Sequence, residues 1–107
     1  MESMNNSHPH IIVSVLAIAY NHEPWIARAL ESIVMQKTKF PIEILVHDDA
    51  STDRTAEIIK EYVRKYPDLI KPLYQTENQY SKGISPILIL SETARGKYLA
   101  LCECDDY

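Results

Sequence analysis

The chain has 107 residues, which is enough for one domain with a modest core. Its formal net charge of −4 excludes the basic surface of a nucleic-acid-binding protein, and no apolar run reaches the roughly 20 residues that a membrane-spanning helix needs. The first ten residues, MESMNNSHPH, lack the basic and apolar regions of a secretory signal. We therefore expect a disordered leader over residues 1–10 and a cytoplasmic protein.

Two strand–helix units are predicted in the first half of the chain. Residues 11–20, IIVSVLAIAY, form a nearly continuous apolar run, which is typical of a strand buried on both faces. Residues 24–36 begin with proline and carry apolar side chains at helical spacing, so they predict the first helix. Residues 42–48 predict the second strand. Residues 51–53, Ser-Thr-Asp, are expected to cap a second helix that Pro67 ends.

The second half of the chain predicts two more strands and a third helix. Residues 69–75, LIKPLYQ, read as an edge strand because Pro72 cannot donate a ladder hydrogen bond. A third helix is expected over residues 85–94, with Gly96 just beyond its C-terminal cap, and residues 97–103 predict a fourth strand. This alternation indicates an α/β fold, a three-layer α/β/α sandwich with a mostly parallel sheet.

Polar side chains follow three of the four predicted strands. Tyr20 and Asn21 follow the first strand, Asp48 and Asp49 end the second, and residues 103–106 end the fourth. Ligands of parallel sheets bind beyond the carboxyl ends of the strands, so we expect these residues to converge on one rim. Two of these residues could also have a purely structural role. Tyr20 either stacks on a base or packs on the sheet, and Asp49 either contacts a ligand or starts a turn.

The acids at the end of the chain suggest a metal site. Glu103, Asp105 and Asp106 carry carboxylate oxygens, which Mg²⁺ and Mn²⁺ prefer as ligands. The chain has only two glycines and no Gly-rich phosphate-binding turn, so a cation and a basic side chain, Lys82 or Arg95, would have to bind phosphates. The alternative is that the acids form a solvated surface loop and the bases are surface charges.

Four segments together resemble a known family. VSVLAIAYNHEPWIARALESIVMQ, IEILVHDDASTDRTAEIIKEY, ENQYSKG and ARGKYLALCECDDY, in this order, resemble the N-terminal half of a family 2 glycosyltransferase, a nucleotide-sugar-dependent enzyme of the GT-A fold. The resemblance covers residues 11–107 and implies the nucleotide-sugar-binding half of such a domain. It implies inverting transfer of a sugar from a nucleotide-diphosphate donor, most commonly a UDP-sugar, to a saccharide or lipid-linked acceptor in cell-surface polysaccharide synthesis.

The resemblance also implies roles for single residues. Those at the strand ends and in the loop before the third helix would bind the donor: Ile18, Ala19, Tyr20, Asn21, Glu23, Asp48, Asp49, Lys82, Glu103 and Cys104. Asp105 and Asp106 would bind Mn²⁺ or Mg²⁺. Ile18 stands where the family commonly has proline, Glu103 stands where aspartate is commoner, and the third helix lacks the family's arginine, with Lys82 as a conceivable replacement.

The resemblance places the general base and the acceptor pocket beyond Tyr107. We therefore expect this chain to be inactive by itself and to expose an apolar face through which it could form homo-oligomers. Peripheral attachment to the inner face of the plasma membrane remains an alternative to a free cytoplasmic location. The competing functions are a non-catalytic α/β binding or assembly module and a receiver-like domain, although the first strand lacks the acids that a receiver needs.

Overall fold

The computed structural model describes residues 11–35 and 41–103, in which strands and helices alternate along the chain. The strands are β1 (Val13–Ala19), β2 (Ile42–Asp48), β3 (Ile70–Tyr74) and β4 (Tyr98–Glu103). The helices are α1 (Glu23–Val34), α2 (Thr55–Lys65) and α3 (Pro86–Ser91), with a 3₁₀ turn, η2 (Tyr80–Lys82), before α3. The predicted leader, residues 1–10, lies outside the described residues, and so do Cys104 and the acids Asp105 and Asp106.

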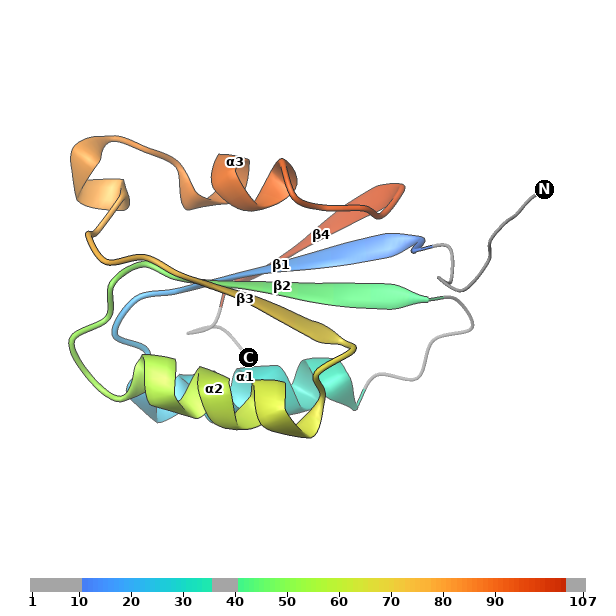
Figure 1. The fold of residues 1–107 in the computed structure, drawn as a ribbon, viewed down its shortest axis with the longest axis horizontal. Coiled ribbons are helices and arrows are strands. Elements are labelled where there is room, and N and C mark those ends of the chain that lie inside the picture. Colours follow the sequence, from blue (N-terminus) through green and yellow to red (C-terminus); the bar gives the residue numbers. More distant parts are fainter. Residues whose placement is uncertain (1–10, 36–40, 104–107) are drawn as a thin grey trace.

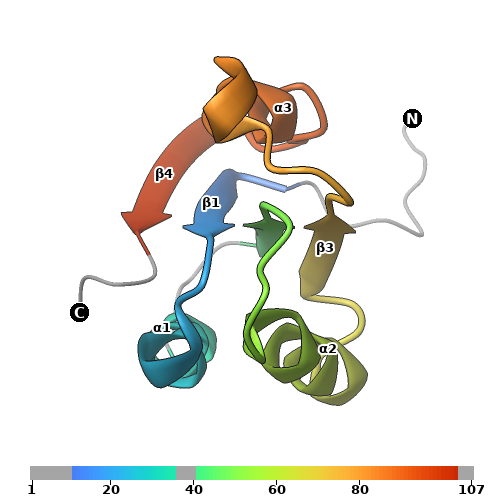
Figure 2. The same cartoon turned by 90° about the vertical axis from the view of Figure 1, so that its left-hand side faces the viewer.

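The described strands form one sheet in the order β3-β2-β1-β4, and every neighbouring pair is parallel. Helices α1 and α2 cover one face of this sheet and α3 covers the other (Figure 1). The end-on view shows β3 and β4 as the two edges (Figure 2). The predicted α/β/α sandwich is confirmed, and so is the prediction that the strand with Pro72 is an edge strand.

The two faces of β2 pack against different helices. Ile44 and Val46 lie in the core formed with α1 and α2, which also buries Ile26, Leu30 and Ile59. Leu45 instead packs with Leu16 of β1 and Leu90 of α3. Successive side chains of a strand point to opposite faces. The residues near the end of β2 therefore also alternate between the side of α1 and α2 and the side of α3.

The third helix is shorter than predicted, and the predicted role of Gly96 is wrong. Helix α3 ends at Ser91, five residues before Gly96, so this glycine does not cap it. A Cβ atom at position 96 would lie 2.6 Å from the Ser14 nitrogen, which is closer than real Cβ atoms approach. Gly96 is therefore required by the close passage of the chain against β1.

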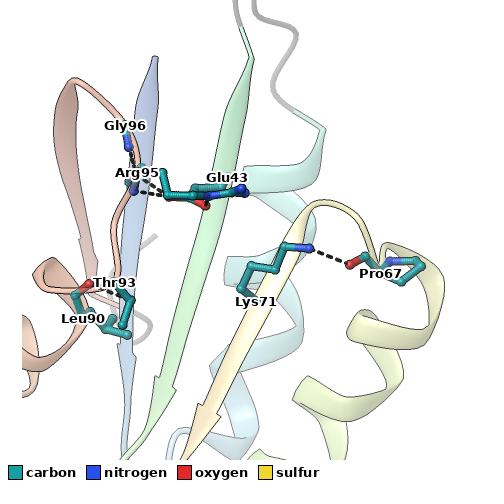
Figure 3. Close-up of polar contacts among 8 residues, drawn as sticks. Glu43, Pro67, Lys71, Leu90, Thr93, Arg95 and Gly96 are labelled. Carbon is teal, nitrogen blue, oxygen red and sulfur yellow. Dashed lines mark hydrogen bonds and ion pairs between the residues drawn. The ribbon is translucent and has the colours of Figure 1, made fainter. Parts of the chain in front are cut away.

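Arg95 lies at the amino edge of the sheet, far from the predicted rim. Its backbone N–H donates to Glu43 Oε2 at 2.7 Å and its Nε donates to Glu43 Oε1 at 3.1 Å (Figure 3). Ser14 Oγ donates to the same carboxylate at 2.7 Å and accepts from the Gly96 N–H at 2.8 Å. Burial alone would raise the pKa of Glu43, but the bonds from Arg95 and Ser14 hold it below its ordinary value. The suggestion that Arg95 binds phosphates at the rim is therefore wrong.

Candidate functional site

A cavity of about 930 Å³ lies at the carboxyl edge of the sheet, on the side of α3. Its walls come from the ends of β1, β2 and β4, from the loop after β3 and from the start of α3. The lining residues are Ile18, Tyr20, Asp49, Asn78, Tyr80, Ser81, Gly83, Ile84, Ser85, Pro86, Ile87 and Leu101. Three of the predicted donor-binding residues, Ile18, Tyr20 and Asp49, are thus brought together around one hollow.

The structure separates the two aspartates that the sequence left undecided. Asp49 lines the cavity, whereas Asp48 is paired in register with Tyr74, which packs against the core under α1 and α2. Asp48 accepts a hydrogen bond from the Ser51 hydroxyl on that side. Burial, and after it the Asp48 charge, raises the pKa of Tyr74. Both aspartates are buried, but only the alternation of β2 decides which one reaches the cavity.

Asp49 holds the loop that follows β3. Its Oδ1 accepts the backbone N–H of Gln79 at 2.7 Å, and its Oδ2 accepts the backbone N–H of Tyr80 at 3.1 Å. The Asn78 side chain donates to the Asp49 carbonyl oxygen at 3.1 Å. A carboxylate offers about four lone-pair positions, so the two hydrogen bonds from the loop leave acceptor capacity for a ligand. Asp49 can therefore fix this loop and accept hydrogen bonds from a ligand at the same time.

Asn21 connects the loop after β1 to the loop after β2. Its backbone N–H donates to Ser51 Oγ at 2.9 Å, and its Oδ1 accepts the Thr52 N–H at 2.7 Å. Asn21 has a φ of 53° and Ala50 a φ of 62°, so a left-handed residue lies two positions after the end of each of these strands. This conformation is tolerated by asparagine but strained for alanine. The two loops are thus held in a specific arrangement at the rim beside Tyr20.

Asp53 joins the starts of α1 and α2. Its Oδ2 accepts the Glu23 N–H at 3.1 Å, and its Oδ1 accepts the Thr55 N–H at 2.9 Å. In return Glu23 Oε1 accepts the Arg54 N–H at 3.2 Å, and Thr55 Oγ1 accepts the His22 N–H at 2.9 Å. Burial alone would raise the pKa of Asp53, but hydrogen bonds from the Thr55 hydroxyl and from the backbone N–H groups of Thr55 and Glu23 lower it. The predicted capping by residues 51–53 is only partly right. Arg54 is the N-cap residue of α2, and Ser51 and Thr52 bond to Asn21, but the Asp53 carboxylate accepts the first N–H group of both α1 and α2.

The other predicted donor residues lie in different surroundings. Ala19 is buried in the core, and its carbonyl oxygen accepts the Asp49 N–H at 2.9 Å. The Lys82 ammonium forms an ion pair with Glu77 within the loop after β3. The hydrogen bond from Lys82, and then its charge, lowers the pKa of Glu77. Lys82 is therefore already paired, and its predicted contact with phosphate stays a prediction.

The end of β4 reaches the predicted place beside β1. Glu103 is the register partner of Ile18 in the parallel pair of β1 and β4. The last residue of β4 therefore lies beside a residue that lines the cavity. Cys104, Asp105 and Asp106 lie outside the described residues. Within residues 11–35 and 41–103, no three His, Cys, Asp or Glu side chains are placed to share a metal ion. No helix of this described part is long and apolar enough to cross a membrane.

His47 is a buried titratable group that the sequence did not single out. Its side chain is fully buried, its Nε2 lies 3.3 Å from the Gln75 amide nitrogen, and its Nδ1 has no hydrogen-bond partner among the described residues. Burial lowers its pKa, although the charges of Asp49 and Asp48 oppose the shift. Side chains two positions apart on an extended chain point to the same face. The sequence could therefore have predicted that His47 lies on the same side as Asp49.

The loop after β3 contributes more to the cavity than the sequence predicted, since Lys82 was the only residue of this loop expected to bind the donor. Tyr80 and Ile84 of this loop line the cavity, and so does Leu101 of β4. All three side chains are more than 40% exposed. Figure 2 shows the chain crossing from the β3 edge to the α3 face. An aromatic residue in an otherwise polar loop just beyond a strand end was the signal available.

Comparison with known proteins gives a consistent result. The family described as Glycosyl transferase family 2 matches residues 14–107. An uncharacterized protein of Mycobacterium tuberculosis is 46% identical over 96 residues, which are 89% of this chain and 27% of the relative. The chain thus spans about a quarter of the length of this relative.

Solved structures of similar sequence share this architecture. A mannosyltransferase from Pyrobaculum calidifontis, in complex with GDP-Man and Mn²⁺, superposes with a TM-score of 0.74 at 27% identity, over 91% of this chain and 28% of the other. S. aureus TarS 1–349, in complex with UDP-GlcNAc, superposes with a TM-score of 0.74 at 28% identity, over 91% of this chain and 27% of the other.

Proposed function

The chain belongs to glycosyl transferase family 2 and has the α/β architecture of GT-A glycosyltransferases, and from this premise we propose that its cavity binds the nucleotide of a nucleotide-sugar donor. The whole protein would transfer the sugar to an acceptor hydroxyl with inversion, in the synthesis of a cell-surface polysaccharide. The observation that carries the proposal is the cavity itself, which gathers Ile18, Tyr20 and Asp49 at the carboxyl edge of a parallel sheet.

The described residues suit the nucleoside part of such a donor. Tyr20 is 43% exposed at the cavity, so one face of its ring is available for stacking on a base. The remaining lone pairs of Asp49 can accept from a base N–H or a ribose hydroxyl. In UDP and GDP the base and the ribose both carry such donors, so the lining does not by itself choose between the two.

In the proposed reaction the acceptor hydroxyl oxygen attacks the anomeric carbon of the donor sugar. The bond from that carbon to the diphosphate oxygen breaks, the diphosphate leaves with the electron pair, and a general base takes the hydroxyl proton. Attack from the side opposite the leaving group inverts the carbon. The chain's own residues would bind the nucleoside and fix the loops around it, whereas the base is proposed to lie beyond Tyr107.

The carboxylates of Asp105 and Asp106 have the hard oxygen donors that suit Mn²⁺ or Mg²⁺. We propose them as the ligands. A cation bound there would stabilise the negative charge that develops on the departing diphosphate. The mannosyltransferase neighbour was solved with Mn²⁺ and GDP-Man, which supports the use of a divalent metal in related enzymes.

Isothermal calorimetry tests the proposal directly. UDP and GDP are titrated into the folded protein with and without Mn²⁺, and the titration is repeated with Asp105→Ala. We expect one nucleotide to bind in a metal-dependent way, and we expect Asp105→Ala to weaken that binding. If neither nucleotide binds to protein whose circular dichroism shows the native fold, the proposed function is refuted.

One observation favours the assembly module as a second candidate. β4 is an edge strand with three large, exposed side chains, Tyr98, Leu99 and Leu101, each more than 50% accessible. Leu99 and Leu101 lie on one face of β4 and Tyr98 on the other, and exposed apolar side chains along an open edge are suited to packing against another chain or segment. Concentration-dependent self-association in light scattering, together with no nucleotide binding, would support this candidate over the transferase.

A further inference from the structure

We propose that Tyr80 is a further donor-binding residue, whose ring stacks on the nucleobase and so provides a second aromatic contact in addition to Tyr20. The inference rests on the proposed function, because it assigns a residue to the same cavity. It concerns the loop just before α3, the helix that lacks the arginine expected from the family resemblance.

The position of the Tyr80 ring is the first argument. Tyr80 lines the cavity and is 76% exposed, so its ring is almost uncovered by the described protein. Tyr20, Ile84 and Leu101 line the same cavity and are also exposed. A cavity lined by several large, exposed apolar or aromatic side chains is typical of a ligand-binding site.

The loop that carries Tyr80 is held before any ligand arrives. The Tyr80 backbone N–H donates to Asp49 Oδ2, and the Tyr80 carbonyl oxygen accepts the Gly83 N–H at 3.0 Å. The Ser81 N–H donates to Asn78 Oδ1 at 2.8 Å. Because the backbone of the loop is already held, only the side-chain rotamers of Tyr80 have to be ordered when a ligand covers the ring, which reduces the entropic cost of stacking.

The contact through Asp49 links the loop to the ligand. The same carboxylate that anchors the Tyr80 backbone faces the cavity, so a base bound to Asp49 lies near the loop that carries the ring. A flat heterocycle presents π faces to an aromatic side chain, and such stacking tolerates different bases. This chemistry favours the base over the diphosphate as the part that Tyr80 contacts.

The test compares three substitutions at Tyr80 with a matched control. Tyr80→Phe keeps the ring, Tyr80→Leu keeps an apolar side chain without a π face, and Tyr80→Ala removes both. Tyr98→Leu is the control, because Tyr98 is 58% exposed on β4 and is not among the residues that line the cavity. The dissociation constant is measured in Mn²⁺ with UDP or GDP, whichever the unmodified protein binds more tightly, and with the corresponding nucleoside by NMR titration.

We expect Tyr80→Ala to weaken binding of the nucleotide roughly 5- to 100-fold, the range seen when a stacking aromatic is removed. Tyr80→Phe should stay within about twofold of the unmodified protein and Tyr80→Leu should fall between them, since the π face carries the interaction. The nucleoside should lose affinity by the same factor as the nucleotide, because both carry the base. A loop with a merely structural role would not produce this order.

Three results would overturn the inference while the proposed function stands. The first is nucleotide binding that Tyr80→Ala leaves unchanged, and the second is an equal loss for Tyr80→Phe and Tyr80→Ala. The third is a loss with Tyr98→Leu as large as that with Tyr80→Ala. If the unmodified, folded protein binds neither nucleotide, the proposed function fails and this inference fails with it.

Discussion

Replacement of Asp49 by asparagine should loosen the loop after β3 far more than the same change at Asp48. The two residues are neighbours, and they are 2% and 3% exposed, so burial alone does not distinguish them. Their partners do. Asp49 accepts two backbone N–H groups of the loop, whereas Asp48 accepts the hydroxyl of Ser51.

The magnitude follows from the donors that face each carboxylate. Hydrogen bonds to a charged acceptor contribute roughly 1.5–3 kcal/mol each, and neutral ones about 1 kcal/mol. The single oxygen of an asparagine at position 49 could keep the bond to Gln79, but its NH₂ group would face the N–H of Tyr80. We expect a loss of about 2–4 kcal/mol in the local stability of the loop. At position 48 the asparagine oxygen can still accept from Ser51, so the loss should be about 1 kcal/mol or less.

Hydrogen exchange measured residue by residue is the suitable assay. In Asp49→Asn, the amides of Gln79 and Tyr80 should exchange at least tenfold faster than in the unmodified protein, because a tenfold change corresponds to about 1.4 kcal/mol. The amides of β1 and β2 should change less, since the loop can open without unfolding the sheet. Hydrogen exchange of Asp48→Asn, measured at the same amides, provides the matched control.

Two outcomes would refute this reasoning. Unchanged exchange at Gln79 and Tyr80 in Asp49→Asn would show that the carboxylate does not hold the loop. A larger destabilisation by Asp48→Asn than by Asp49→Asn would show that the two side chains are assigned to the wrong faces of β2. The second result would also move the proposed nucleotide contact from Asp49 to Asp48.

Three further changes test other parts of the structure. Asp53→Ala removes the acceptor shared by the first N–H groups of α1 and α2, and urea unfolding should show a loss of about 1–3 kcal/mol; a loss under 0.5 kcal/mol would contradict the shared cap. Gly96→Ala forces a Cβ against Ser14 and should cost about 1–3 kcal/mol, whereas Gly83→Ala meets no atom within 4 Å and should cost about 1 kcal/mol through its φ of 79°. Burial lowers the pKa of His47 in the folded protein, so the unfolded chain binds a proton at this residue at a higher pH than the folded protein does. The free energy of unfolding should therefore fall as pH drops below about 6.5. His47→Leu should make the free energy of unfolding less dependent on pH in this range.

Local patterns were sufficient to predict the layers of the fold. The apolar runs of β1 and β2 need burial on both faces, and this requirement alone predicts helices on both sides of the sheet. Pro72 excluded a central position for β3, and the structure confirms it at an edge. These features depend on residues close together in the sequence, so one sequence is enough to reveal them.

The details of the rim could not be predicted in the same way, because they depend on contacts between distant residues. The sequence could not choose between Asp48 and Asp49, since the choice depends on which face of β2 meets α3. Gly96 was misassigned because its close neighbour, Ser14, lies 82 positions away in the chain. Arg95 was misplaced because its partner, Glu43, appeared only as one polar residue inside a strand.

The rim of this protein is built without glycine-rich turns, and this explains why acidic residues near a strand end are an ambiguous signal. Backbone N–H groups of the loops must find acceptors, and here the side chains of Asn21, Asp49, Ser51 and Asp53 supply them. Two of these residues are acids whose main contacts are within the protein. The number of carboxylates at a rim therefore overstates the number available to a metal ion. An acid can be assigned to a ligand only after the backbone donors around it have been counted, which is why Asp49 is proposed here for both tasks.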